Sequence, residues 1–171
     1  MASLVPALRR PWRAGGLRHL NLGGNSGLGD AGVAALAKAL PPSLETLGIS
    51  NTGCGDDGLV ALAAALPAFT RLERLWCEHN PAATARGWVA LAGALPSLPA
   101  LAQLAAGCCT GMGSEGAAAL AATIPQCPRL RDLHVYDCGL GAQAKAALRS
   151  AAASVPRSAE RPGGLLSLIH I

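Results

Sequence analysis

The chain has 171 residues, of which 51% are hydrophobic, only 3% aromatic and only 14% charged. With so little aromatic volume, the core must be filled by Leu and Ala, which suits thin layers packed closely together. The net charge is +4, but no cluster of Lys or Arg is interleaved with aromatics, and no apolar run approaches the ~20 residues of a membrane helix. We therefore predict neither nucleic-acid binding nor membrane association.

Residues 1–16, MASLVPALRRPWRAGG, precede the first recognisable pattern and contain arginines but no acidic residue. An acid-poor segment with arginines is one property of an organelle transit peptide. The segment is short, and the regular pattern begins directly after it. We expect it to be an N-terminal leader or a partial cap.

A nine-residue pattern recurs five times at nearly equal spacing. Its copies begin at Leu17, Leu44, Leu72, Leu101 and Leu130, so the starts step by 27, 28, 29 and 29 residues. Each copy has apolar or small residues at its first, fourth and sixth positions, and Asn, Thr or Cys at its ninth. This alternation predicts a short strand that buries positions four and six and exposes positions three, five and seven.

A helical pattern follows each of the first four copies. A Gly stands four residues before a Leu, which stands four before another Leu or Ile, so all three share one helical face. The groups are Gly32/Leu36/Leu40, Gly58/Leu62/Leu66, Gly87/Leu91/Leu95 and Gly116/Leu120/Ile124. The Gly allows close approach to a neighbouring helix, and a proline after each helix is expected to stop it. Residues at helix starts, where a cap or a negative charge is favourable, are Asp30, Asp56, Asp57, Ser114 and Glu115.

A unit of strand, turn and helix cannot bury its apolar side alone, so neighbouring units must stack into a continuous core. The pattern LxxLxLxx(N/C), followed by GxxxLxxxL, resembles the leucine-rich repeat family, and the long period resembles its ribonuclease-inhibitor type. The resemblance implies an α/β solenoid, part of a right-handed horseshoe, with a concave parallel sheet and convex helices. We place the repeats at 17–43, 44–71, 72–100, 101–129 and 130–153.

The repeat register accounts for most of the cysteines. Cys77 takes the buried sixth position of its copy, and Cys54 stands where Leu28 stands in the first copy. Cys109 and Cys138 occupy the ninth position, where the resemblance implies that Asn or Cys satisfies backbone groups of the turn. Small, buried and reduced thiols are typical of a reducing compartment, so we predict a cytoplasmic protein. Cys109 and Cys138 are expected to be stacked neighbours, and a disulfide between them is the alternative.

No arrangement of residues predicts catalysis or a bound cofactor. Cys77, His79 and the later pair Cys108–Cys109 do not have the spacing of a zinc site. The glycine-rich segments GLGDAG and GCGDDG coincide with the turn and helix entry of their copies, which explains them without a phosphate loop. We therefore predict that the chain is not an enzyme and needs no metal or cofactor.

Functional residues are expected on the concave face, at strand positions that do not serve the stack. Trp76 is the strongest candidate, because a large aromatic at a solvent-facing strand position is a typical interface anchor. The alternative is that Trp76 covers a small neighbour, Gly48 or Ala105. The predicted partner-binding residues are His19, Asn21, Thr46, Arg74, Trp76, Glu78, Gln103, Asp132, His134 and Tyr136.

The predicted function is a non-catalytic protein–protein interaction module that binds a partner protein on its concave face. The resemblance also implies two alternatives. Ran GTPase-activating proteins resemble this repeat type, and Arg18 or Arg74 is then the candidate arginine. The ligand-sensing repeats of nucleotide-binding innate-immune-type receptors are of the same kind, but that hypothesis requires a P-loop domain outside this sequence.

The chain changes character after Ala153. SVPRSAERPGG is linker-like, and the last six residues, LSLIHI, are unrelated to the repeat. Translation of CTG TCT CTT ATA CAC ATC, the start of a common transposase sequencing adapter, yields the same six residues. We expect a disordered tail at 154–171, with adapter read-through at 166–171. The repeat array is also expected to lack terminal caps, which favours self-association through its open ends.

Overall fold

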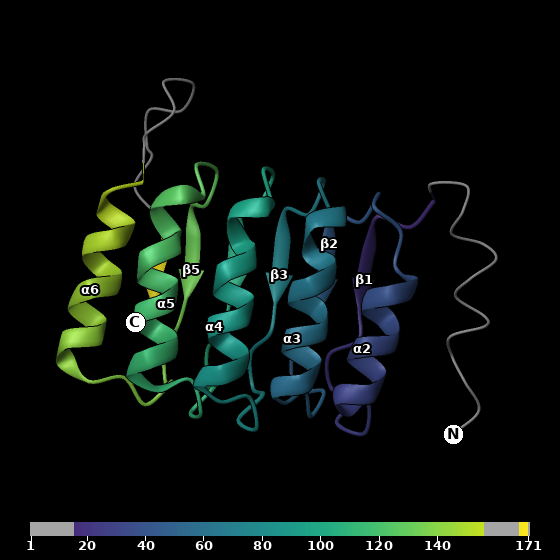
Figure 1. The fold of residues 1–171 in the computed structure, drawn as a ribbon, viewed down its shortest axis with the longest axis horizontal. Helices are drawn as coiled ribbons and strands as arrows, with labels where there is room; N and C mark the ends of the chain where they lie inside the picture. Colours follow the sequence, from purple (N-terminus) through teal and green to yellow (C-terminus); the bar gives the residue numbers. More distant parts are fainter. Residues whose placement is uncertain (1–15, 156–167, 171) are drawn as a thin grey trace.

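The computed structural model, which describes residues 16–155 and 168–170, has one parallel sheet with helices on one face (Figure 1). The strands, in spatial order, are β1 (His19–Asn21), β2 (Thr46–Gly48), β3 (Arg74–Trp76), β4 (Gln103–Ala105), β5 (Asp132–His134) and β6 (Leu168–His170). The helices are α2 (Gly29–Ala39), α3 (Asp56–Ala65), α4 (Ala85–Ala94), α5 (Gly113–Thr123) and α6 (Ala142–Ala153). The helices alternate with β1 to β5 along the chain, so the fold is the predicted α/β solenoid.

The strands pair in the register that the repeat pattern predicts. His19 aligns with Thr46, Arg74, Gln103 and Asp132, so corresponding residues of successive copies form continuous rungs across the sheet. The central leucine of each strand from β1 to β5 points toward the helices. From β2 onward these leucines are at most 1% exposed, as expected for the fourth position of the copy. The residues directly before and after each central leucine, such as Arg74 and Trp76 in β3, face away from the helices and form two rungs across the sheet. We call this surface the open sheet face.

The core is built mainly from Leu and Ala, as the composition predicts, and its two largest side chains are Phe69 and Trp88. Trp88 on α4 is fully buried and lies against Gly116 of α5. A Cβ at Gly116 would lie 2.9 Å from the Cβ of Trp88, so the glycine is what permits this close approach. The predicted role of the helix glycines is thereby confirmed at this interface.

α2 ends just before Pro41, as predicted, but the other three prolines after helices act differently from the prediction. Pro67, Pro96 and Pro125 do not end the helical path but lie inside short 3-10 turns that continue directly from α3, α4 and α5. These turns are η2 (Leu66–Ala68), η3 (Leu95–Ser97) and η4 (Ile124–Gln126). Proline fits early in such a turn because its missing N–H would have no partner there and its φ is already helical. It therefore tightens the last turn before the chain returns to the sheet.

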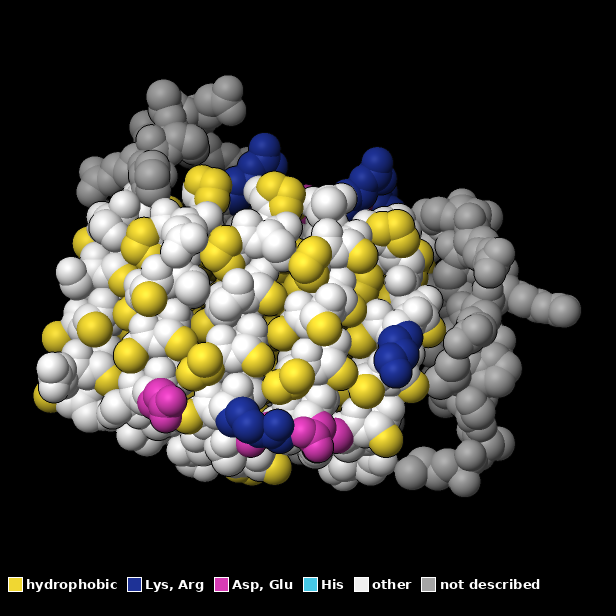
Figure 2. All heavy atoms as spheres, viewed as in Figure 1, with side chains coloured by type: hydrophobic (Ala, Val, Ile, Leu, Met, Phe, Trp, Pro, Cys, Tyr) yellow, Lys and Arg dark blue, Asp and Glu magenta, His cyan; other side chains and the backbone are white. Residues whose placement is uncertain are grey.

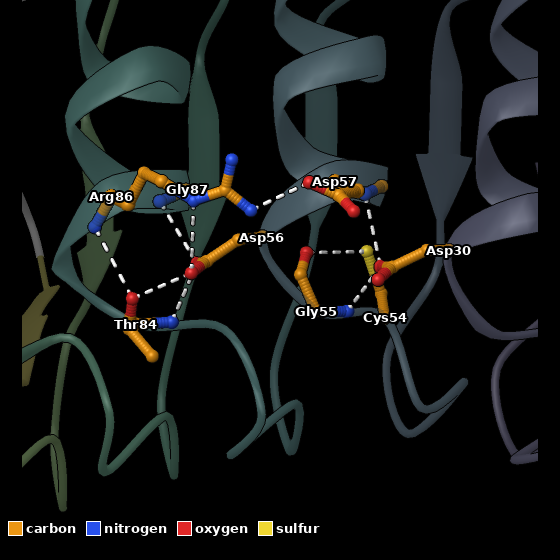
Figure 3. A network of polar contacts seen from close by, with 9 residues as sticks. Asp30, Cys54, Gly55, Asp56, Asp57, Thr84, Arg86 and Gly87 are labelled. Carbon is orange, nitrogen blue, oxygen red and sulfur yellow. Dashed lines mark hydrogen bonds and ion pairs between the residues drawn. The ribbon is translucent and has the colours of Figure 1, made fainter.

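Two of the acidic residues at the helix starts, Asp30 and Asp56, stabilise the next helix rather than their own (Figure 3). Oδ1 of Asp30, on α2, accepts hydrogen bonds from the backbone N–H groups of Gly55 (2.6 Å) and Gly58 (2.9 Å) at the start of α3. No side-chain cap is formed within α2 itself. The sequence pointed to the helix that contains Asp30, because only the stacked repeats show that a neighbouring helix start lies within reach.

Asp56 repeats this arrangement one unit later. Its Oδ1 accepts from the N–H groups of Thr84 (2.8 Å) and Gly87 (2.9 Å) at the start of α4, and its Oδ2 accepts from the Thr84 hydroxyl at 2.6 Å. Arg86 adds ion pairs to Asp56 and to Asp57. Burial alone raises the pKa of Asp56, but the hydrogen bonds from Thr84, Gly87 and Arg86 outweigh it and hold the pKa below its usual range.

The carboxylate ladder ends at the third repeat, where Ala85 stands at the position of Asp30 and Asp56. The next helix, α5, satisfies its own start instead, because the N–H of Gly116 donates to the Met112 carbonyl at 3.2 Å. With this bond α5 begins one residue earlier, relative to its helix glycine, than α3 and α4 do, at Gly113, whose φ of 58° is left-handed. A helix start in this array is thus capped either by the preceding repeat or by itself.

The ninth position of each copy ties the turns together, as the resemblance implies. Asn80 is fully buried, and its Oδ1 accepts from the N–H groups of Thr52 and Cys54 in the preceding repeat, each at 3.1 Å. Its Nδ2 donates to the carbonyls of Ile49 (2.9 Å) and Cys77 (3.0 Å). One amide therefore satisfies backbone groups of two consecutive repeats.

The eighth position of every copy has a left-handed backbone. Gly24 adopts it in the first copy, and Asn51, His79, Cys108 and Asp137 adopt it in the others, with φ between 52° and 57°. Asn and Asp tolerate this conformation better than most residues, but Cys has no such advantage. Cys108 is therefore strained by the repeat register rather than by any local preference.

The C-terminal tail differs from the predicted disorder at three residues. Leu168–His170 form β6 and pair with β5 in the same parallel register as the other strands. A sheet edge carries unpaired N–H and C=O groups that an extended segment can satisfy, which is the physical reason for this pairing. The rest of the predicted tail beyond Val155 and the leader up to residue 15 lie outside the described residues.

Replacing Asp56 by Asn is expected to lower the free energy of unfolding by about 2 kcal/mol at neutral pH, because the charged cap of α4 is lost. The pKa of Asp56 is lowered in the fold. The stabilisation is therefore fully present above the pKa that Asp56 has in the unfolded chain. It is lost as the pH falls through the lower pKa that Asp56 has in the folded protein. Urea unfolding of both proteins should show a difference in free energy of unfolding that becomes smaller when the pH is below about 3.9, the ordinary pKa of aspartate.

Asp57→Asn is the matched control for Asp56→Asn. Asp57 lies beside Asp56, but its side chain is 75% exposed and its described contact is the ion pair with Arg86. An exposed ion pair contributes on the order of 0.5 kcal/mol. Equal losses for the two variants would contradict the inter-repeat cap.

Cys108→Asn is expected to raise the free energy of unfolding by about 0.5 to 1 kcal/mol, because Asn reduces the cost of the left-handed backbone. Cys108→Ala removes the same thiol but keeps a Cβ with no compensating side-chain hydrogen bond, so it should give no gain. Thermal and urea unfolding of the three proteins measure this. An equal gain for Ala and Asn would assign the effect to the thiol instead.

Candidate protein-binding face

The open sheet face alternates between repeats with large side chains and repeats with small ones. The third repeat contributes Arg74, Trp76 and Glu78, and the fifth contributes Asp132, His134 and Tyr136. Between them, the fourth contributes Gln103, Ala105 and Gly107, and the second contributes Thr46, Gly48 and Ser50. Since the rungs run straight across the sheet, the large side chains of odd repeats are able to lie over the small residues of even ones.

One rung of the open sheet face begins with His19, Thr46 and Arg74, and the hydroxyl of Thr46 connects these three side chains. His19 Nδ1 lies 3.1 Å from this hydroxyl, and Arg74 Nη1 donates to it at 3.4 Å. Thr46 is only 5% exposed, so the prediction that it presents its side chain to a partner is wrong. The alternation of the strand places Thr46 on the correct face, but its neighbours His19 and Arg74 have longer side chains that lean over it.

Trp76 lies flat across the second rung rather than standing away from the sheet. A Cβ at Gly48 would lie 3.2 Å from Trp76 Cε3, so the six-membered ring packs over the second repeat. On the other side, Trp76 Nε1 donates to Gln103 Oε1 in the fourth repeat at 3.1 Å. The indole therefore covers a small neighbour, as the alternative prediction has it, and still presents a half-buried aromatic surface at the centre of the sheet.

Tyr136 crosses the fourth repeat to reach Glu78. Its ring lies on Gly107, where a Cβ would come within 2.5 Å of Tyr136 Cζ, and its hydroxyl donates to Glu78 Oε1 at 2.9 Å. This hydrogen bond, followed by burial, raises the pKa of Tyr136 to about 12. Two predicted residues that are 58 positions apart are thus joined. The Gly at the seventh position of the fourth copy is the sequence signal that could have indicated it.

The remaining predicted residues lie on the same face but at its ends. His19 and Asn21 are exposed on β1, where Asn21 Oδ1 accepts from the N–H of Gly23 at 2.9 Å. Asp132 and His134 are half-buried on β5 at the other end. The structure therefore joins Arg74, Trp76 and their neighbours at the centre and leaves β1 and β5 as flanks.

Charge is distributed unevenly between the two ends of the strands. Figure 2 shows basic side chains projecting along the upper edge, where helices end and strands begin, while along the lower edge most of the visible acidic side chains lie next to a basic one. The arginines at the strand starts are Arg18, Arg71, Arg74, Arg129 and Arg131, against the carboxylates Glu45, Glu73 and Asp132. Sequence analysis missed the ion pair of Arg18 with Glu45 (2.5 Å), which joins the first two repeats.

The cysteines contribute no reactive thiol to this face. All six are free, and Cys108 is the one that is partly exposed. Burial raises the pKa of the Cys54 and Cys109 thiols to about 12, which keeps them protonated and poorly nucleophilic. The Cys138 thiol donates to the Ala106 carbonyl at 3.0 Å, so it serves the turn backbone as the ninth position requires.

Within the described part of the chain, no group of three or more His, Cys, Asp or Glu side chains is arranged to hold a metal ion. The longest described helix, α6, has 12 residues, and the described helices include none with the length and apolar character of a membrane span. The open sheet face carries aromatic and polar side chains that hydrogen-bond to one another across repeats.

Comparison with known families matches residues 17–37 to a family described as Leucine Rich repeat. The match spans β1 and most of α2, which form the first of the stacked units. Comparison with curated proteins found no match. Together with the strands and helices described above, the match fits an α/β leucine-rich repeat solenoid.

Glu78→Gln is expected to return the pKa of Tyr136 from about 12 toward the ordinary value of about 10, because the neighbouring carboxylate charge is removed. Tyr136 is the only tyrosine in the chain, so its phenolate absorbance reports on this residue alone. Alkaline titration with circular dichroism at each pH measures the midpoint in folded protein. Glu73→Gln, which removes a carboxylate just before β3, is the control and should leave the midpoint unchanged.

Proposed function

We propose that this chain is a non-catalytic interaction module that binds a partner protein on its open sheet face. The observation that supports this most directly is the position of Trp76. Its indole lies at the centre of a face without helices, over Gly48 and bonded to Gln103. A large aromatic held in one orientation loses little conformational entropy on binding, which is the property of an interface hot spot.

The surroundings of Trp76 extend this proposal from one residue to a surface. Tyr136 and Glu78 are locked together on one side, and Arg74 lies one rung away on the other. A preorganised set of aromatic, acidic and basic groups can discriminate between partners, since each polar group of a poor partner is left unpaired. Leucine-rich repeats commonly serve as protein-interaction modules, which agrees with this use of the face.

The ribonuclease-inhibitor type of repeat is part of the proposal. Strands β1 to β5 start 27, 28, 29 and 29 residues apart, and each of these repeats carries a helix of 10 to 12 residues. A reducing, cytoplasmic location is proposed for a related reason. Cys109 and Cys138 donate their thiols to turn carbonyls, and a disulfide would remove both donors.

The GTPase-activating alternative depends on an arginine that is available to reach a nucleotide. Arg18 is held by Glu45, and Arg74 leans over β2 toward Thr46, so neither lies on a projecting loop. Stimulated GTP hydrolysis that is lost in Arg74→Ala would favour this alternative over the binding module. The innate-immune receptor alternative requires sequence outside this chain.

Trp76→Ala is expected to weaken binding of the partner by at least about tenfold, the loss typical of a hot-spot aromatic. Affinity capture from cell extract with wild type, followed by affinity measurement on each captured protein, tests this. Val89→Ala, which truncates an exposed apolar side chain on the helix face, is the matched control and should bind like wild type. Loss of partners in Val89→Ala alone would move the binding surface to the helices.

A further inference from the structure

Arg74 is the cation at the centre of the open sheet face, and its charge has no carboxylate partner among the described residues. Its described contact is the hydrogen bond from Nη1 to Thr46 Oγ1, at a long 3.4 Å. By contrast, Arg18 and Arg86 each form an ion pair of 2.6 Å or shorter. A guanidinium has five N–H donors, so most of the hydrogen-bonding capacity of Arg74 is available to a ligand.

The neighbours of Arg74 on its own rung do not offset its charge. Thr46 lies on one side and Gln103 on the other, and both are neutral. Gln103 has its side-chain oxygen occupied by the indole of Trp76, so that acceptor is already used. Arg74 is also half-buried, which strengthens its interaction with a ligand charge relative to an exposed arginine.

The edge of the sheet next to Arg74 carries an excess of positive charge. With Arg74 included, five arginines stand at the strand starts against three carboxylates. Two of those carboxylates are paired with arginines of the same edge, Glu45 with Arg18 and Asp132 with Arg131. Arg71, Arg129 and Arg131 are exposed along this edge. The field over this half of the sheet therefore attracts a negatively charged segment.

Trp76 follows Arg74 on the same face of the same strand. Residues two apart on a strand are separated by about 7 Å. An extended peptide has the same spacing between side chains that point to one side. A segment lying along β3 thus places one side chain at Arg74 and the next same-side one at Trp76.

Resting on the proposed function, we infer that the partner presents an extended acidic segment to this face. An Asp or Glu carboxylate pairs with the Arg74 guanidinium, and an apolar side chain two residues away packs on the Trp76 indole. Carboxylate is the matching group because its two oxygens meet the guanidinium fork in two parallel hydrogen bonds.

A random-peptide display library is the probe for this inference. Peptides selected on the wild-type chain are expected to be enriched in Asp or Glu two positions from an apolar residue. Selection on Arg74→Glu should lose the acidic residue and keep the apolar one. Arg149→Gln, which removes an exposed charge on α6 and leaves the sheet edge unchanged, is the matched control and should select the wild-type pattern.

A synthetic peptide from the wild-type selection then gives affinities. Arg74→Gln is expected to weaken its binding at least tenfold, and raised salt should weaken wild type more than Arg74→Gln. Wild-type peptides without acidic enrichment, or unchanged affinity in Arg74→Gln, would overturn the acidic segment. If the peptides selected on the wild-type chain still bind Trp76→Ala more weakly in either of these cases, the proposed function stands. If neither variant changes binding, or if nothing is selected on wild type, both proposals fail.

Discussion

The structure depends on one constraint: no repeat of this chain can bury its apolar side or satisfy its backbone by itself. A three-residue strand and a helix of about three turns expose leucines on one side and unpaired N–H and C=O groups at every end. Stacking in register solves both problems at once. The leucines of neighbouring repeats pack together, and polar side chains bridge from one repeat to the next. Asn80 does this for the turns, and Asp30 and Asp56 do it for the helix starts.

These bridges show how the array combines a repeated pattern with local variation. Asp56 is replaced by Ala85 one unit on, and the following helix then begins one residue earlier relative to its helix glycine, at Gly113, with a backbone hydrogen bond from Gly116 to Met112. Cys109 takes the place of Asn80 and keeps a thiol donor toward the Cys77 carbonyl at 3.4 Å. The backbone requirement is constant, while the side chain that meets it changes. This explains how repeats with different residues keep the same register.

The open sheet face is a consequence of the same register. Because corresponding residues of all repeats line up in rungs, a small residue in one repeat leaves room for a large residue from the next. Gly48 accommodates Trp76, and Gly107 accommodates Tyr136. The large side chains therefore lie down on the sheet and form a surface that is ordered before any partner arrives. Preorganisation of this kind lowers the entropy cost of binding.

The sequence by itself determined the repeat length, the alternation of buried and exposed strand positions and the face on which every candidate residue lies. It could do so because period and register are properties of the chain that stacking preserves. Only the tertiary structure decided which neighbours touch. Thr46 is on the predicted face but covered, Asp56 caps the following helix, and Tyr136 bonds to Glu78 across an intervening repeat. Each of these contacts joins residues from different repeats. Their formation depends on side-chain lengths and directions that no single copy of the pattern contains.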